Sequence, residues 1–202
     1  MDPADHHDTR GQSYTQRLEQ HSGVWWKRAL NVQAPYHWNL RRQQLGRTLD
    51  IGCGIGRNLE ALPPGSVGVD HNETSVRAAR SLGHTAYTWD EFCASEHNVK
   101  ESFDGLLVAH VIEHMERAQA VDLLHTYLPY LRPGGRTFFI CPQERGYASD
   151  ATHVQFTTGS DLESLATEVG LQPAGAFSFP FPRAAGRWFT YNEFCLLSTK
   201  PA

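Results

Sequence analysis

Residues 109–115, AHVIEHM, place three ionisable side chains directly after an apolar run. His110, Glu113 and His114 are spaced i, i+3 and i+4, which puts them on one face if the segment is helical. Two imidazoles and a carboxylate can form part of a shell around a divalent metal ion. The same residues could instead begin an ordinary solvated helix, or supply a histidine as a general base. The residues alone leave these three interpretations open.

A fourth candidate ligand, His153, follows the next predicted strand, in the segment YASDATHVQF. The apolar runs at residues 103–111 and 136–142 predict neighbouring strands of a parallel sheet. Ligands of open parallel sheets bind at the carboxyl edge, so the segments that follow the two strands should meet there. We therefore expect His153 to lie over the AHVIEHM cluster.

Three glycines, Gly52, Gly54 and Gly56, follow the first predicted strand in TLDIGCGIGRN. Glycines at that point let the backbone approach a ligand closely. Asp70 ends the second predicted strand, in VGVD, where an acid can accept both hydroxyls of a ribose. Asp50 precedes the first glycine by two residues, and it would repel a pyrophosphate but suits the cationic methionine end of S-adenosylmethionine (SAM). The spacing also departs from the dinucleotide pattern G-x-G-x-x-G, so we favour SAM.

Strand and helix signals alternate along the chain, and the predicted elements position these candidate residues. Apolar runs predict strands, and amphipathic segments closed by Gly or Pro predict helices. The predicted strands cover residues 47–52, 66–70, 84–89, 103–111, 136–142, 175–181 and 191–199, and the predicted helices cover 14–45, 56–62, 73–83, 115–131 and 158–170. Thr158 or Ser160 is the expected cap of the last helix. This alternation implies a mostly parallel sheet with helices on both faces.

The composition narrows the class of protein. The chain has 202 residues, which suits one domain with a sizeable core. Its net charge of −4 disfavours a nucleic-acid partner. No apolar run approaches the roughly 20 residues that a membrane helix needs. The four cysteines are scattered and form no C-x-x-C pair, which predicts reduced thiols in a cytoplasmic protein.

Taken together, the motifs resemble those of the class I SAM-dependent methyltransferases. LDIGCGIGRNLEAL is similar to their first motif, VGVD to their ribose-binding acid, FDGLLVAHVIEHM to their fourth strand and YLRPGGRTFFI to the turn into their fifth. The resemblance implies a Rossmann-like α/β fold whose seven-stranded, mostly parallel sheet carries helices on both faces and has its last strand antiparallel. It implies a methyltransferase domain at residues 45–202, with residues 1–44 as an N-terminal tail and helical cap over the cofactor.

The resemblance also implies positions for SAM. Asp50 and the glycine turn would line the methionine part, and Asp70 would hold the ribose. The segment WDEF, residues 89–92, would flank the adenine, with Asp90 reaching its exocyclic amine. The complete expected cofactor set is Asp50, Gly52, Gly54, Gly56, Asp70, His71, Asp90, Glu91, Phe92 and Ala109.

The AHVIEHM cluster resembles the metal-binding E-x-x-E-H element of ubiquinone-pathway O-methyltransferases and of small-RNA terminal 2′-O-methyltransferases, the latter of which add a later histidine. This chain departs at the first ligand position, which holds His110 instead of Glu. The expected metal site is His110, Glu113, His114 and His153. The added nitrogen ligand makes Mn²⁺, Fe²⁺, Co²⁺ or Zn²⁺ as suitable as Mg²⁺. The metal-free alternative keeps His110 or His114 as the catalytic base.

The acceptor pocket is expected to mix aromatic and cationic side chains. The candidate substrate residues are Trp25, Trp26, Tyr36, Arg183, Trp188 and Tyr191. Such a mixture suits a polar ring, so we expect a small-molecule or oligosaccharide acceptor, first of all a sugar or glycoside hydroxyl. A resemblance to small actinobacterial methyltransferases, some of which methylate mannosides in methylmannose-polysaccharide synthesis, makes a mannoside one candidate.

Other functions stay open at this point. A phenol or catechol is the second acceptor class, a small RNA methylated at a 2′ hydroxyl is the third, and a SAM-binding protein without turnover is the non-enzymatic alternative. A nicotinamide dehydrogenase is disfavoured by the glycine spacing. We expect no membrane partner, and a homodimer is left open.

Overall fold

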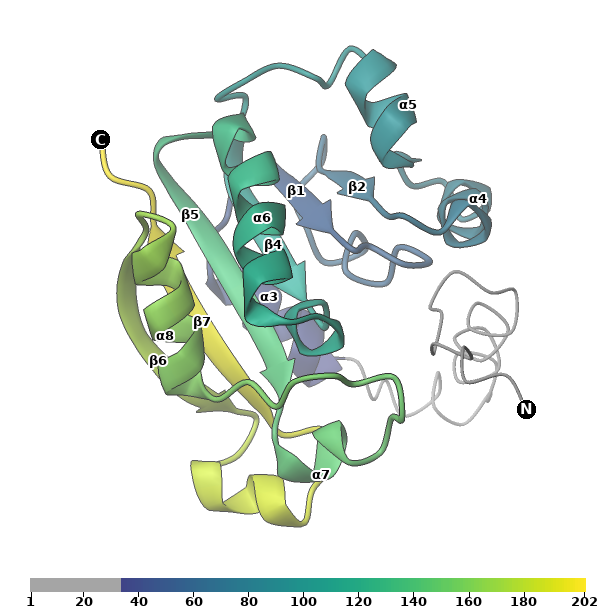
Figure 1. Ribbon diagram of the computed structural model, residues 1–202. Helices are drawn as coiled ribbons and strands as arrows, with labels where there is room; N and C mark the ends of the chain where they lie inside the picture. The colour runs from purple at the N-terminus through teal and green to yellow at the C-terminus, as the bar shows by residue number, and fades with distance from the viewer. Residues whose placement is uncertain (1–33) are drawn as a thin grey trace, which may run out of the picture.

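Seven strands form a single sheet in the order β3-β2-β1-β4-β5-β7-β6 (Figure 1). This is a computed structural model, and it describes residues 34–202. The strands are β1 (Thr48–Ile51), β2 (Val67–Val69), β3 (Ala86–Tyr87), β4 (Phe103–Ala109), β5 (Leu131–Pro142), β6 (Gln172–Phe179) and β7 (Glu193–Thr199). Strand β7 is antiparallel to both of its neighbours, and the pairs among β1 to β5 are parallel. The predicted Rossmann-like sheet with an antiparallel last strand is confirmed.

The centre of the sheet is buried on both faces. Every residue of β1 is buried, and β4 is buried from Gly105 to Ala109. Successive side chains of a strand point to opposite faces, so an apolar residue at each position is what two covered faces require. Leu106 and Val108 of β4 accordingly pack in one core cluster, and Leu107 and Ala109 pack in the other.

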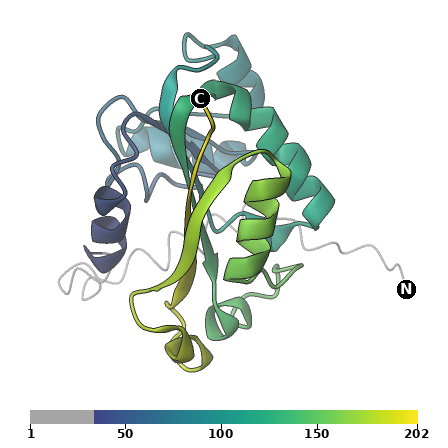
Figure 2. The same ribbon diagram turned by 90° about the vertical axis from the view of Figure 1, so that its left-hand side faces the viewer.

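Helices cover both faces (Figure 2). The helices are α3 (Ala34–Arg42), α4 (Glu73–Ser81), α5 (Trp89–Ala94), α6 (Arg117–Tyr127), α7 (Glu144–Tyr147) and α8 (Gly159–Glu168), with the short 3-10 segments η1 (Ile112–His114), η2 (Leu128–Tyr130) and η3 (Arg183–Arg187). The core on one face takes side chains from α5, α6 and α8, and the core on the other face takes them from α3 and α4. Thr158 caps α8 through a capping box with Asp161, as one of the two expected caps.

Three predicted elements differ clearly from the structure: the helix at residues 56–62 and the strands that correspond to β5 and β6. Strand β5 begins at Leu131, five residues earlier than expected, and so includes RPGG, the expected turn before it. The segment at residues 56–62 forms a series of turns instead of a helix, although Leu59 and Leu62 still reach the core. Only seven residues, 56–62, precede Pro63, so few hydrogen bonds could offset the cost of a first helical turn. Strand β6 begins three residues earlier than expected and ends before cis-Pro180. The glycine turn therefore leads into further turns, and no helix N-terminus lies behind it.

The N-terminal part of the chain lies partly outside the described residues. Of the predicted helix at 14–45, α3 accounts for residues 34–42. Leu40 and Leu45 belong to a core cluster of the sheet, and Asn39 donates to Cys195 Sγ of β7 at 3.5 Å. A domain boundary at residue 44 stays a prediction. Among the described residues, no helix has the length and apolar character to cross a membrane.

Candidate active site

The turn after β1 has the backbone that its glycines predict. Gly52, Gly54 and Gly56 all have positive φ angles, of 72°, 54° and 87°. A Cβ at Gly52 would lie 2.5 Å from Cγ2 of Val111, so the turn passes too close to the start of η1 for a side chain. The Gly52 N–H donates to the carbonyl of Val69 at 2.8 Å, which ties the turn to the end of β2. The turn is thus held between β2 and the AHVIEHM segment.

Asp50 and Asp70 lie at the carboxyl ends of β1 and β2 and are both buried. Both oxygens of Asp70 accept backbone bonds, from the N–H of Gly54 and of Asn72, each at 2.8 Å. Asp50 Oδ1 accepts a long bond of 3.4 Å from Asn58, whereas its buried Oδ2 has no partner within residues 34–202. Burial raises the pKa of Asp50 to about 8, and the bond from Asn58 offsets only part of the shift. An unpaired acid that burial keeps from ionising fits a site for a cationic group.

The residues expected to lie near the adenine and ribose differ in how far their side chains are exposed. Asp90 is exposed at the first turn of α5, and Ala109 is buried at the end of β4. Phe92 is wholly buried against Trp89, so its side chain belongs to the core. Glu91 is held in the capping box of α5 and by two bonds from Arg80. His71 is half exposed and its Nδ1 lies 3.5 Å from Asp70 Oδ1.

The imidazole of His110 lies between two carboxylates, and one of them belongs to the predicted ligand Glu113. Its backbone has φ of 58°, a left-handed conformation that turns the chain after β4. Its Nδ1 lies 3.2 Å from Oε1 of Glu113, and its Nε2 lies 2.9 Å from Oε1 of Glu193. The ring of Tyr36 stacks on the imidazole with 6.3 Å between the ring centroids. Both ring nitrogens thus face carboxylates, and the group of ligand atoms that lie close together is Glu113, His114 and His153. A role for His110 as metal ligand or base stays a prediction.

The remaining three predicted ligands come together. One ligand atom each of Glu113, His114 and His153 lie within 4.8 Å of one another. His114 Nδ1 is 3.3 Å from the carbonyl of Thr152, and His153 Nδ1 is 2.7 Å from the carbonyl of Tyr147. A nitrogen facing a carbonyl carries the proton, so the Nε2 lone pair of each ring is left to bind a metal. This donor set fits a divalent transition metal better than Mg²⁺, which prefers oxygen.

Burial and neighbouring charges set the protonation of these groups. Burial opposes a charged His110, but the bonds to Glu113 and Glu193 outweigh it and raise the pKa of His110 to about 10. Burial likewise acts to raise the pKa of Glu113, yet His110 brings it below its usual value. The pKa of His114 is lowered, chiefly by burial, which keeps its imidazole neutral. Glu113 is thus ionised and His114 neutral, the forms that a metal ion requires.

Among the described residues, the four candidate substrate residues Tyr36, Arg183, Trp188 and Tyr191 lie on different elements. Trp25 and Trp26 lie outside the described residues, and Tyr36 contacts His110. Trp188 and Tyr191 are exposed on the connection between β6 and β7, where the ring of Tyr191 packs edge-on against Phe189.

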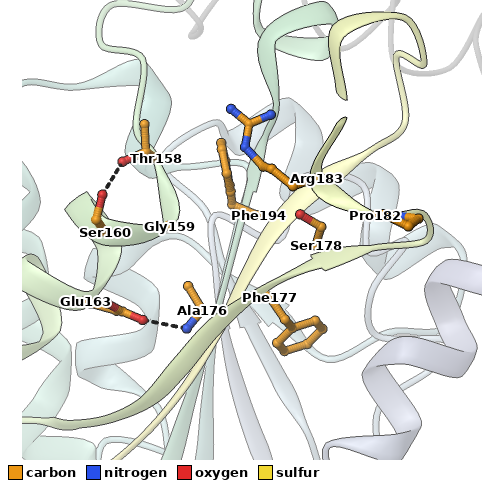
Figure 3. A pocket seen from close by; sticks show the side chains of 10 residues that line it. All are labelled: Thr158, Gly159, Ser160, Glu163, Ala176, Phe177, Ser178, Pro182, Arg183 and Phe194. Carbon is orange, nitrogen blue, oxygen red and sulfur yellow. Dashed lines mark hydrogen bonds between the residues drawn. The ribbon is translucent and has the colours of Figure 1, made fainter. Parts of the chain in front are cut away.

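Arg183 lines a separate pocket of about 560 Å³ between the first turn of α8 and the end of β6 (Figure 3). Its guanidinium packs over the ring of Phe194 and pairs with Glu144. The pocket is lined by Thr158, Gly159, Ser160, Glu163, Ala176, Phe177, Ser178, Pro182, Arg183 and Phe194. None of these residues belongs to the group of Glu113, His114 and His153, so Arg183 lies at a different place on the protein from that group.

Glu193 is the site residue that the sequence did not single out. It begins β7 in the segment YNEF and is 7% exposed. A lone acid at the start of a strand makes no local pattern. One signal was nevertheless present, because an antiparallel last strand starts at the edge where the parallel strands end.

Comparison with known proteins identifies the domain. Residues 49–137 match the family model described as a methyltransferase domain. No curated protein matches the sequence. Among solved structures, a SAM-dependent methyltransferase from Archaeoglobus fulgidus superimposes with a TM-score of 0.63 at 18% identity, covering 82% of this chain and 93% of that one.

Two further structures share the fold. Magnesium protoporphyrin IX methyltransferase from Synechocystis, with SAH bound, gives a TM-score of 0.65 at 15% identity and covers 96% of this chain and 97% of its own. A methyltransferase from Haloferax volcanii, in complex with the Trm112 activator, gives 0.58 at 16% identity and covers 88% of this chain and 95% of its own. The structures establish the fold, and the matched domain spans β1 through β5, where the glycine turn and both acids lie. Residues 49–137 thus match a methyltransferase domain, and the described part of the chain has the fold of solved SAM-dependent methyltransferases.

Proposed function

We propose that the chain is a metal-dependent O-methyltransferase that acts on a hydroxyl of a small polar acceptor, with a sugar or glycoside ahead of a phenol or catechol. The observation that carries this proposal is the cluster of Glu113, His114 and His153, whose ligand atoms lie within 4.8 Å of one another. The two backbone carbonyls that fix the histidine rings support it, because metal-binding histidines usually donate their second nitrogen in this way.

The cluster suits the chemistry of an oxygen acceptor. An aliphatic hydroxyl is a poor nucleophile at neutral pH, and a divalent ion would supply Lewis acidity that lowers its pKa. Glu113, His114 and His153 would hold such an ion, with Mn²⁺, Fe²⁺, Co²⁺ and Zn²⁺ preferred over Mg²⁺ by the two nitrogen donors. His110 acts on the cluster from outside by holding Oε1 of Glu113. Cys141 lies 3.7 Å from the other oxygen of Glu113, so the carboxylate is fixed on both sides.

The cofactor residues in this proposal lie at the ends of β1 and β2. Asp50 would receive the cationic methionine end of SAM at its unpaired Oδ2, and the glycine turn would admit the chain of the ligand close to the backbone. Asp70 would hold the ribose, with Asp90 and His71 at the margin of the site. Glu91 and Phe92 contribute through the fold of α5 instead of by contact.

The proposal is tested by methyl transfer from labelled SAM to a panel of glycosides and catechols, with and without each divalent metal. Transfer should disappear after prolonged EDTA treatment and return with Mn²⁺ or Zn²⁺. A matched control is the same prolonged dialysis without EDTA, which leaves bound metal in place. Transfer that survives complete removal of metal, confirmed by elemental analysis, contradicts metal dependence. A methyl group found on nitrogen or carbon contradicts O-methylation.

A further inference from the structure

The edge of the sheet at which β4 and β5 end contains a buried carboxylate that the proposed metal site does not use. Glu193 is the first residue of β7 and pairs with Pro142 at the end of β5. Its backbone is fixed, since its carbonyl accepts a bond of 2.9 Å from the buried side chain of Gln143. The side chain is therefore held at the same edge as His110, which follows β4.

Only one oxygen of this carboxylate has a partner within residues 34–202. Oε1 of Glu193 accepts from His110 at 2.9 Å, whereas Oε2 is buried and has no hydrogen bond. The hydroxyl of Tyr36, whose ring stacks on His110, is also buried and unpaired among the described residues. Buried polar atoms are nearly always hydrogen-bonded in native proteins, so two such atoms around one imidazole indicate a missing polar group.

The position of Glu193 assigns that missing group to the acceptor. The glycine turn, Asp50 and Asp70 lie at the ends of β1 and β2. Strands β4 and β5 separate these from β7 in the sheet. A ligand that reaches Glu193 therefore extends past the end of β4, away from the glycine turn and towards the last two strands.

The charge of the site limits what that ligand can carry. Glu113 and Glu193 share the single imidazole of His110, and no Lys or Arg pairs with either carboxylate among the described residues. Oε2 of Glu193 can accept a hydrogen bond but cannot donate one while it is ionised. A hydroxyl satisfies it, and a carboxylate or phosphate at the same place would be repelled.

We propose that Glu193 is a specificity-determining residue that accepts a hydrogen bond from a hydroxyl next to the methylated one. It thereby selects neutral vicinal diols over acceptors that carry an anionic group beside the reacting hydroxyl. This inference rests on the proposed transfer to oxygen, and it narrows the acceptor class. It does not depend on the metal, because Glu193 contacts none of the three proposed ligands directly.

Two matched acceptor pairs test the proposal: catechol with 2,3-dihydroxybenzoate, and methyl α-D-mannopyranoside with its uronic acid. Wild type should methylate at least one neutral member with kcat/KM about tenfold or more above its anionic partner. Glu193→Gln should lower kcat/KM for that neutral member by about tenfold, mainly by raising KM. It should also reduce the ratio of kcat/KM between the neutral acceptor and its anionic partner. Glu193→Asp keeps the charge, so it should raise KM and still discriminate against the anion.

Glu168→Gln is the matched control, because it removes an exposed carboxylate of α8 that pairs with Arg117 of α6. It should behave as wild type. SAM affinity by calorimetry and bound metal by elemental analysis should stay at wild-type values in Glu193→Gln, which separates acceptor binding from loss of fold, cofactor or metal.

Three results overturn the inference: turnover of the anionic members in preference to the neutral ones, turnover of none of the four acceptors by SAM-bound wild type, or equal kinetics for Glu193→Gln and Glu168→Gln. Transfer that survives metal removal while the effect of Glu193→Gln persists would refute the metal proposal alone.

Discussion

A hydrogen bond of 2.9 Å joins His110 to Glu193 and so connects the end of β4 with the beginning of β7. The strand between them, β5, contributes no side chain to this bond. The other nitrogen of His110 lies 3.2 Å from Glu113, which belongs to the proposed metal cluster. One imidazole thus holds a carboxylate on the metal side and a carboxylate on the acceptor side.

The first prediction concerns this imidazole and stability. The pKa of His110 is raised to about 10, so its contribution to folding is fully present below about 6.5 and is lost as the pH rises through 10. His110→Asn keeps a residue that tolerates positive φ but leaves both carboxylates without a cation. Because the ring is partly exposed, we expect a loss of about 1–2 kcal/mol at pH 6, less than for a fully buried pair. Urea unfolding at pH 6, 8 and 10 measures it.

The loss in His110→Asn should shrink towards pH 10. His125→Asn, on the exposed face of α6, provides the control and should show no loss at any of the three values. A pH-independent difference between wild type and His110→Asn would show that the imidazole is not charged in the folded protein.

The second prediction concerns Asp50. Its pKa of about 8 means that the ligand-free site is largely protonated at neutral pH, and a cation that pairs with it must release that proton. SAM affinity should therefore rise between pH 6 and pH 8, by up to about tenfold per pH unit, and should level off above pH 8. Calorimetry at pH 7 in buffers of different ionisation enthalpy should show proton release in wild type and none in Asp50→Asn.

The same substitution has a predicted effect on folding. A carboxyl whose pKa is raised in the folded state destabilises the fold increasingly between its unfolded pKa of 3.8 and its folded pKa of about 8. Asp50→Asn should thus unfold at a higher temperature than wild type at pH 8 and at about the same temperature at pH 4, while binding SAM poorly. A lower melting temperature at pH 8 would mean that Asp50 is ionised and paired.

The third prediction concerns metal content. His114→Ala and His153→Ala should each lower the affinity for Mn²⁺ or Zn²⁺ by at least about tenfold, because each removes one of three ligands. Dialysis against the metal followed by elemental analysis measures this without any acceptor. His125→Ala should retain the wild-type content. Equal metal content in all three variants would place any bound ion elsewhere.

The fourth prediction separates backbone strain from a clash. Gly52→Ala puts a Cβ 2.5 Å from Val111 at a φ of 72°, whereas Gly83→Ala has a φ of 87° and nothing within 4 Å of its Cβ. We expect Gly83→Ala to cost about 1–2 kcal/mol and to leave SAM affinity unchanged. Gly52→Ala should cost about 2–4 kcal/mol and weaken SAM binding, and Val111→Ala added to it should recover part of both. Urea unfolding and calorimetry report the two effects.

Local pattern was sufficient for most of the fold, because burial on both faces leaves a continuous apolar run in strands such as β4. The local pattern was insufficient at residues 56–62. There the apolar residues have helical spacing, but the segment forms turns that place Leu59 in the core. The spacing of apolar residues indicates which side chains are buried, and a segment of seven residues can bury them without forming a helix.

The candidate site was predictable where topology decides it. His153 lies beside His114 because the loops after two neighbouring parallel strands share an edge. The direction of His110 was not predictable, since it follows from a positive φ that the residue type does not require. Glu193 was missed for a related reason: its role depends on a bond to a residue 83 positions away.

The antiparallel β7 has a consequence for how the protein is made and altered. The glycine turn and both acids are synthesised in the first part of the chain, whereas Glu193 reaches the site only when the final hairpin enters the sheet. With the role proposed for Glu193, a nascent chain would complete the ends of β1 and β2 well before it could discriminate among acceptors. Exchange of the β6–β7 hairpin between related enzymes is accordingly a route to new acceptor selectivity that leaves the methyl-donor half untouched.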